Sequence, residues 1–318
     1  MHKMHQELVS AAKDLAIEVI ELDSIGAEGI LLFKKDNKEV VFREGFPLNL
    51  LNTQTEFWLD NKQLTKRTFE QLGITCPKSI VIEATQNEQA IADFWVDGVV
   101  YVSKPLYGTD GDGVEMNVKT KEHLKDYLNN WKSKYKLFLL EEQVEGEDLR
   151  IHILGGKIVA ACCRKPAYVV GDGEQNIEEL ISQRSKVIKQ QNPANKLIVD
   201  QVTKDLLRIQ GLLLSTIPKK GQEIKLKHVA NMSQGGIAID ITEELHPKYQ
   251  EWVTLLAKEL NASCFALDAI TKDHTVYPED TTWALEINPR PHWLHHTFSE
   301  VKQHPMAQMI LKEVFGLN

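Results

Sequence analysis

Ser103-Lys104-Pro105-Leu106-Tyr107-Gly108-Thr109-Asp110-Gly111-Asp112-Gly113-Val114 is the segment from which the architecture of this chain is best inferred. The apolar run 99–102 precedes it and the alternating run 114–118 follows, so the pattern predicts two strands joined by a glycine-rich hairpin. Gly108, Gly111 and Gly113 lack Cβ atoms, which lets successive backbone N–H groups surround an anion. Lys104 adds a positive charge where the first strand ends. Taken alone, the segment fits either an ordinary surface loop or a polyphosphate clamp.

The composition indicates a globular protein of about two domains. The chain has 318 residues, of which 42% are hydrophobic and 26% charged, and its net charge of -8 argues against a general nucleic-acid or anionic-membrane surface. Its four cysteines form no C-x-x-C pair, so we expect neither a disulfide framework nor a thiolate zinc site. The N-terminal residues lack a signal-peptide pattern, and no apolar run is long enough to span a membrane. The expected location is the reducing cytoplasm.

The order of helical and strand patterns predicts a mixed α and β protein. A helix at 4–16 and short strands at 17–22, 29–33 and 39–43 predict a small N-terminal α/β unit, residues 1–58. Lys62 opens a helical pattern that runs to Leu72, where free backbone amides favour an anion. A solvated surface lysine is the alternative for Lys62. Further helices are expected at 87–95, 120–133, 176–190 and 199–210.

Two further strand patterns carry candidate binding groups. The run 136–140 predicts a strand that is buried on both faces and ends in Glu141-Glu142-Gln143-Val144. Such an end either offers backbone groups to the edge of a base or simply leaves the core. Residues 148–161 predict a hairpin because Gly155-Gly156 joins two alternating runs, which places Arg150 and His152 on one strand face.

Carboxylates near the end of the chain predict a cation site. Asp268 interrupts an apolar strand pattern, and a buried carboxylate needs a cation or hydrogen bonds. Glu286 and Asn288 project from one face of the next strand because they lie two residues apart. Oxygen atoms from three such side chains suit Mg²⁺. Singly these acids fit a structural role equally well, but with a glycine loop and lysines they predict a metal–nucleotide site.

The ordered motifs resemble those of ATP-grasp carboxylate–amine ligases. The match is most specific to the ATP-grasp portions of cyanophycin synthetase and bifunctional glutathione synthetase, and it covers the chain from about residue 60 to about residue 291. It rests on three runs that reproduce the family's GGKVVA, RxPAxVxGDG and ANxSxGG patterns in order, which start at Gly155, Arg164 and Ala230. The resemblance implies an ATP-grasp fold of α+β class, in which two α/β subdomains clamp ATP. The expected boundaries are 59–139 for the lid subdomain with the glycine-rich loop and 140–318 for the subdomain with the metal site.

The resemblance also implies roles for individual residues. Lys62 and Lys104 would contact the ATP phosphates, the loop from Gly108 through Gly111 to Gly113 would form a mobile lid, and Glu141, Glu142 and Val144 would line the adenine and ribose pocket. Two Mg²⁺ ions, replaceable by Mn²⁺, would be held by Asp268, Glu286 and Asn288. Arg150, Arg164 and Asn231 would lie beside the reacting phosphate, and Arg150 or Arg290 would fix the carboxylate or stabilise an oxyanion. The expected substrates are amino acids or short peptides joined through an acyl phosphate, without nucleic acid or membrane, in a protein that could form a homodimer.

Departures from the family pattern concern the substrate side. His228 stands where an arginine is usual, Tyr168 where histidine is common, and Pro289 begins an unusual segment that contains His292, His295 and His296. These three histidines have the i, i+3, i+4 spacing of helical zinc ligands, but the neighbouring prolines favour a place in the acceptor pocket or the core. The additional domains of the two named enzymes have no counterpart in this sequence, so neither activity transfers whole.

Two alternatives to a ligase fit the same nucleotide clamp. A small-molecule kinase would stop at a phosphorylated product and release no free phosphate. A non-catalytic nucleotide-binding protein would keep the glycine loop without needing the set formed by Asp268, Glu286 and Asn288.

Overall fold

The computed structural model describes residues 3–50, 53–85, 88–108, 112–193, 195–230 and 232–317. These residues pack as two compact units, each assembled from separate stretches of chain. The first unit comprises Met1–Asn49, Ala160–Thr242 and His292–Asn318, and the second comprises Leu50–Val159 and Glu243–Pro291. The domain boundaries expected at residues 58 and 139 stay a prediction. Within the described ranges, no helix is both long and apolar enough to cross a bilayer.

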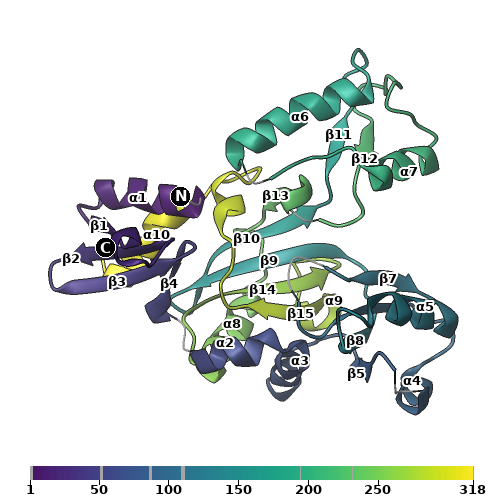
Figure 1. Cartoon of the computed structure of the whole chain (residues 1–318), viewed down its shortest axis with the longest axis horizontal. Coiled ribbons are helices and arrows are strands. Elements are labelled where there is room, and N and C mark those ends of the chain that lie inside the picture. Colours follow the sequence, from purple (N-terminus) through teal and green to yellow (C-terminus); the bar gives the residue numbers. More distant parts are fainter. Residues whose placement is uncertain are drawn as a thin grey trace. The chain divides into compact units, whose positions relative to one another are not determined.

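The N-terminal part of the first unit is a four-stranded antiparallel sheet in the order β1-β2-β3-β4. Helices α1 and α10 pack against each other beside it (Figure 1). Leu31, Phe33, Val40 and Phe42 alternate along the two central strands and are buried, which explains the strand register. The small α/β unit predicted from the sequence is therefore present, with a C-terminal helix added to it. The elements are α1 (Lys3–Asp14), β1 (Glu18–Glu21), β2 (Ile30–Lys35), β3 (Lys38–Arg43), β4 (Phe46–Pro47) and α10 (Met306–Phe315).

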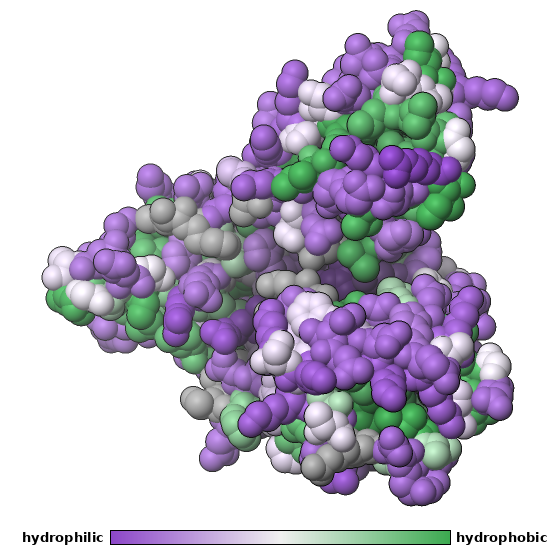
Figure 2. Space-filling model, turned by 45° about the vertical axis from the view of Figure 1, so that its right-hand side comes forward, coloured by the Kyte–Doolittle hydropathy of each residue, from purple (hydrophilic) through white to green (hydrophobic). Residues whose placement is uncertain are grey.

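The remainder of the first unit contains a second small core. Apolar residues of α6 and α7 pack there with those of the antiparallel pair β11 and β12. Apolar side chains also gather on the surface of this part, as Figure 2 shows, among them Val202, Ile209 and Leu213. The elements are β10 (Lys157–Lys165, which begins in the second unit), β11 (Tyr168–Val170), α6 (Ile177–Gln191), α7 (Gln201–Ile209), β12 (Glu223–Lys225), η3 (Met232–Gln234), β13 (Ile237–Asp240) and η4 (Leu294–Thr297).

The second unit contains two groups of antiparallel strands. One is the sheet β5-β8-β6-β7, in which β8 is central and its Phe138, Leu139 and Leu140 are completely buried, as predicted. The other joins β9, β14 and β15 side by side. The elements are α2 (Thr53–Asp60), α3 (Lys62–Gln71), β5 (Ser79–Glu83), α4 (Glu88–Phe94), β6 (Tyr101–Pro105), β7 (Glu115–Val118), α5 (Lys121–Trp131), β8 (Leu137–Glu142), β9 (Glu147–Leu154), α8 (Lys248–Glu259), β14 (Cys264–Thr271), α9 (Pro278–Thr281) and β15 (Thr282–Asn288).

Both predicted hairpins of the second unit are confirmed. Strands β6 and β7 pair antiparallel across the glycine-rich segment, with Tyr101 opposite Val118. Strands β9 and β10 are neighbours, and the turn between them holds Gly155 and Gly156 at φ angles of 61° and 71°. Because L side chains rarely adopt these angles, the paired glycines fix where the chain reverses.

Candidate active site

Helix α3 places the first predicted phosphate ligand. Its N-cap is Asn61, whose side chain accepts hydrogen bonds from the backbone N–H groups of Gln63 and Leu64, so the helix begins at Lys62 as expected. The Nζ atom of Lys62 donates to the carbonyl oxygen of Gly108 at 2.8 Å, which ties the helix start to the glycine-rich segment. Burial lowers the pKa of Lys62, although the charge of Glu286 opposes that shift.

The buried side of α3 reveals a lysine that the sequence analysis did not identify. Leu64 in this helix and Leu72 at its end are only half-buried. Lys66 is instead completely buried, and its Nζ lies 2.9 Å from Oε2 of Glu141. Lys104 reaches the other oxygen of the same carboxylate, with Nζ 2.5 Å from Oε1. Lys66, Lys104 and Glu141 thus form a buried cluster of two cations and one anion, which we call the lysine–glutamate cluster.

The lysine–glutamate cluster has strongly perturbed ionisation. Burial raises the pKa of Glu141, but the two lysines outweigh it and lower that pKa to about 2. Burial alone would lower the pKa of Lys104. The negative charges of Glu141, then Glu286 and more weakly Asp268 outweigh burial, so the pKa of Lys104 is raised above its usual value. For Lys66, burial dominates and lowers the pKa. The influence of Glu286 and Asp268 on Lys104 shows that the lysines and the predicted metal ligands share one electrostatic cluster.

We predict that Glu141 makes the second unit sensitive to acid. The pKa of Glu141 is about 2 when folded and 4.5 normally, so its stabilising contribution is complete above pH 4.5 and is lost as the pH falls from 4.5 towards 2. Lys66→Met removes one of the two cations and should raise the folded-state pKa. Carboxyl-carbon NMR titration of glutamate-labelled protein measures this pKa directly. The titration of Glu141 should stay unchanged in a Glu259→Gln control, and an unchanged titration in Lys66→Met would contradict the cluster.

Strand register brings the predicted metal ligands together. Asp268 of β14 lies opposite Glu286 of β15, and Nδ2 of Asn288 donates to Oδ2 of Asp268 at 2.9 Å. Arg150 of β9 lies opposite Asp268 on the other side and binds it through two hydrogen bonds, Nε to Oδ1 at 2.7 Å and Nη2 to Oδ2 at 2.6 Å. Arg150 and Asp268, for which the sequence suggested separate roles, therefore form one bidentate ion pair.

The oxygen donors of this group fit Mg²⁺. Asp268, Glu286 and Asn288 offer two carboxylates and an amide oxygen from one face of two adjacent strands, and hard oxygen donors of this kind are those that Mg²⁺ accepts. Each carboxylate oxygen of Asp268 can accept more than one contact, so Arg150 does not exhaust its capacity. Asp268, Glu286 and Asn288 would hold the ion, and Arg150 would orient Asp268 towards it.

The ends of the glycine-rich segment are fixed by side chains. On the first side, Nδ2 of Asn61 donates to the hydroxyl oxygen of Tyr107 at 2.9 Å, next to the bond between Lys62 and Gly108. On the second side, the hydroxyl of Tyr127 donates to the Gly113 carbonyl oxygen at 2.6 Å. A Cβ at Gly113 would lie 2.9 Å from Cγ of Pro105, and its φ is 72°, so glycine is required there. Gly111 lies outside the described residues.

The expected base-binding strand end is partly engaged by the protein itself. The backbone N–H of Glu142 donates to the Lys78 carbonyl oxygen, and that of Gln143 donates to the Val100 carbonyl oxygen. The Glu141 carboxylate belongs to the lysine–glutamate cluster rather than projecting freely. Val144 comes directly after Gln143, the last residue with such a backbone contact, and it is half-buried.

The remaining predicted arginines and asparagine have diverse positions. Arg290 is half-exposed and forms an ion pair with Glu56 of α2 at 2.7 Å, so α2 supplies a partner that the sequence did not suggest. Arg164 lies on β10 opposite Ala238 of β13, within the first unit. Asn231 lies outside the described residues. The second unit, in contrast, contains most of the predicted site residues, among them Lys62, Lys104, Glu141, Arg150, Asp268, Glu286 and Asn288.

Two curated proteins share sequence with most of this chain. No model of a known protein family matches the sequence. A cyanophycin synthetase from Geminocystis herdmanii is 32% identical over 244 residues, which are 74% of this chain and 28% of that protein. A glutathione biosynthesis bifunctional protein from Pasteurella multocida is 28% identical over 269 residues, which are 81% of this chain and 35% of that protein. The chain therefore matches only about a third of the length of these curated relatives.

Solved structures decide the fold. The crystal structure of a bifunctional glutathione synthetase from Pasteurella multocida superposes with a TM-score of 0.74 at 23% identity, over 99% of this chain and 43% of that one. The chain has the ATP-grasp fold. A D-alanine–D-alanine ligase from Bacillus anthracis gives a TM-score of 0.51 at 14% identity, over 84% of this chain and 69% of that one. The α+β ATP-grasp architecture and the similarity to both kinds of relative, expected from the sequence, are confirmed.

Proposed function

We propose that this ATP-grasp protein is an ATP-dependent ligase that joins a carboxylate to an amine. The observation that carries the proposal is the proximity of two kinds of group within the second unit. Lys104 forms an ion pair with Glu141, and the charges of Glu286 and Asp268 also raise the pKa of Lys104. Glu286 and Asp268 are residues suited to bind Mg²⁺. A cationic cluster beside oxygen donors for Mg²⁺ is what binding a nucleoside triphosphate requires.

The proposed reaction has two steps. A substrate carboxylate oxygen attacks the γ-phosphorus of ATP, the bond from that phosphorus to the bridging oxygen breaks, and an acyl phosphate and ADP result. The amine then attacks the acyl carbon, phosphate leaves, and a proton is lost from the amine nitrogen. The first step moves a phosphoryl group between two oxygens, and the second moves the acyl group from a phosphate oxygen to the amine nitrogen. Because negative charge builds up on oxygen atoms in both steps, the residues contribute mainly by positioning and by offsetting charge.

The predicted site residues can be assigned to these tasks. Lys62 and Lys104 would bind phosphate oxygens, and the half-buried Val144 backbone with Glu142 would border the adenine and ribose. Bound Mg²⁺ supplies charge neutralisation at the phosphate oxygens. The glycine-rich segment, anchored at Gly108 and Gly113, would cover the acyl phosphate and keep water from hydrolysing it. Arg164, Asn231 and Arg290 are proposed to bind the substrate carboxylate or the transferred phosphoryl group.

The names of the relatives support amino acids or peptides as substrates. Two of the names, cyanophycin synthetase and glutathione biosynthesis bifunctional protein, belong to relatives that match most of this chain. We therefore propose that amino acids or short peptides supply both the carboxylate and the amine, with ATP and Mg²⁺ as the phosphoryl donor and its metal.

We predict that ADP and phosphate appear in equal amounts only when both a carboxylate and an amine are present. The test incubates purified protein with Mg²⁺ and ATP across a matrix of amino acids and short peptides, measures ADP and phosphate, and detects products by mass. A new mass equal to the sum of the two substrates less water would identify them. Reactions without amine, and protein with the Glu286→Gln substitution, are the controls.

Two outcomes of this matrix would contradict the ligase. ADP with a phosphorylated product, no free phosphate and no need for an amine would establish a kinase. ATP binding in a calorimetric titration, without turnover for any pair in the matrix, would favour a non-catalytic nucleotide-binding protein.

A further inference from the structure

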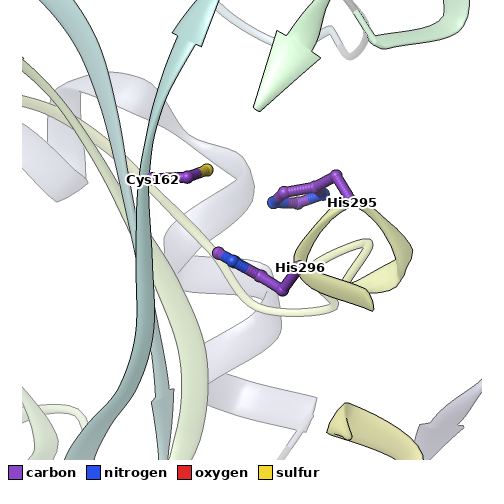
Figure 3. Close-up of side chains that lie close together, drawn as sticks. All are labelled: Cys162, His295 and His296. Carbon is purple, nitrogen blue, oxygen red and sulfur yellow. The ribbon is translucent and has the colours of Figure 1, made fainter. Parts of the chain in front are cut away.

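Three buried side chains of the first unit converge in a cluster that the proposed reaction does not use. Figure 3 shows Cys162 on β10 pointing towards His295 and His296, which follow each other in η4. Their potential ligand atoms, one from each residue, all lie within 4.8 Å of one another. The exposed fractions are 0% for Cys162, 2% for His295 and 0% for His296, so the cluster is inside the protein.

The backbone holds the two histidines in place independently of their side chains. The N–H of Glu300 donates to the Ala238 carbonyl oxygen at 2.9 Å, and the N–H of Asp240 donates to the Glu300 carbonyl oxygen at 3.0 Å. The N–H of His304 donates to the His296 carbonyl oxygen at 2.9 Å. These bonds fix the segment after η4 against β13, which is the neighbour of the strand that carries Cys162. The cluster is thus preorganised by main-chain pairing.

A second layer of polar groups borders the cluster. Asp240 pairs with Cys162 in the register of β13 and β10, and both residues therefore face the same side of the strand pair. Nε2 of His304 lies 2.7 Å from Oδ2 of Asp240, and the His304 and His296 rings are 6.4 Å apart between centroids. Asp240 and His304 thus supply polar groups next to the proposed ligands, where the outer layer of a metal site commonly lies.

The chemistry of the three ligand atoms favours zinc. Thiolate sulfur and imidazole nitrogen bind Zn²⁺ at about 2.3 Å and about 2.0–2.1 Å, so ligands on one ion lie about 3.3–3.7 Å apart. The ligand atoms of the cluster lie within 4.8 Å of one another, so each pair has to approach by about 1.5 Å at most to share one ion. Cys162 is not part of a disulfide, and its thiol would lose its proton on binding the metal.

We propose that Cys162, His295 and His296 bind one zinc ion. The ion would join the C-terminal segment to β10, which lie far apart in the sequence. This differs from the helical zinc motif considered for His292, His295 and His296, because His292 is exposed and Cys162 is the third member of the cluster. Three protein ligands leave a fourth position for water.

Metal analysis of the full-length protein tests the site. After incubation with zinc and gel filtration, mass spectrometry of the metal content should find about one zinc per chain in the wild type and less than about a tenth in Cys162→Ser and His296→Gln. Cys264→Ser is a matched control, because Cys264 is also a buried cysteine outside any disulfide but lies on β14 in the second unit. His292→Gln is the control for the neighbouring histidine. Both controls should keep their zinc.

A measurement on the wild type alone covers the case in which the variants do not fold. Removing the metal with a chelator should lower the unfolding temperature, and returning zinc should restore it. Cobalt in place of zinc should give thiolate-to-cobalt absorption in the near ultraviolet. A wild type that takes up neither ion, full zinc retention in folded Cys162→Ser and His296→Gln, or stoichiometric binding of a different metal after zinc incubation would each overturn the proposal.

Discussion

Glu286→Gln is expected to slow ADP formation about 100- to 1,000-fold while changing the free energy of unfolding by less than about 0.5 kcal/mol. Glu286 is half-buried and lies opposite Asp268, and its charge acts on Lys104, so its carboxylate lies near the proposed metal and the lysines proposed to bind phosphate. Glutamine keeps the size of the side chain but removes the charge that attracts the cation. Because no ion pair with Glu286 holds the described structure together, function should fall and the fold should persist.

Glu286 is a sharper test of the metal site than Asp268. Asp268→Asn would also leave the largely buried Arg150 guanidinium without its carboxylate partner, so a loss of activity there would mix catalysis with instability. The rate of ADP formation and urea unfolding should be measured side by side for Glu286→Gln and for Glu259→Gln, an exposed acid of α8 in the same unit. Full turnover in Glu286→Gln would exclude its role as a metal ligand.

Local patterns predicted most of the elements around this site, because each has a periodic signal of its own. Strand β6, the buried strand β8 and the hairpin at Gly155 follow from short apolar runs and from glycines at the turns. Strand β11 is different. The interval 166–173 shows only proline and glycine turn signals, yet Tyr168–Val170 is a strand because it pairs with β12 more than 50 residues later. Pairing at such a distance leaves no trace in a short window.

Lys66 shows why the site itself was only partly predicted. A lysine among polar residues of an amphipathic helix is usually solvated, so its sequence context gave no reason to bury it. Only the approach of β8, which brings the Glu141 carboxylate within 2.9 Å, makes burial tolerable. The pairing of Arg150 with Asp268 has the same origin, because the register of β9 and β14 creates it from residues far apart in sequence.

Glu141→Gln is expected to lower the free energy of unfolding by about 3–5 kcal/mol, because it removes the anion from a buried pair of lysines. Lys66 is completely buried and Lys104 is 7% exposed, so water cannot replace the lost carboxylate. The glutamine amide has one acceptor oxygen and one NH₂ group. Its NH₂ group would therefore face one of the two ammonium groups, which are also donors and need an acceptor. The lysines would have to lose protons or the cluster would have to open, and either change also weakens phosphate binding.

Lys66→Met is the informative counterpart of Glu141→Gln. It removes one cation and leaves the pair formed by Glu141 and Lys104 intact, with an apolar side chain of similar volume in the buried position, so its cost should stay within about 1 kcal/mol. Adding it to Glu141→Gln removes one of the two stranded charges and should recover part of the lost stability. Urea unfolding of the two single variants, the double variant and Glu259→Gln measures these differences. If Glu141→Gln proved no less stable than Lys66→Met, charge balance would not govern the cluster, and Lys104 would owe its position to packing rather than to the carboxylate between the two lysines.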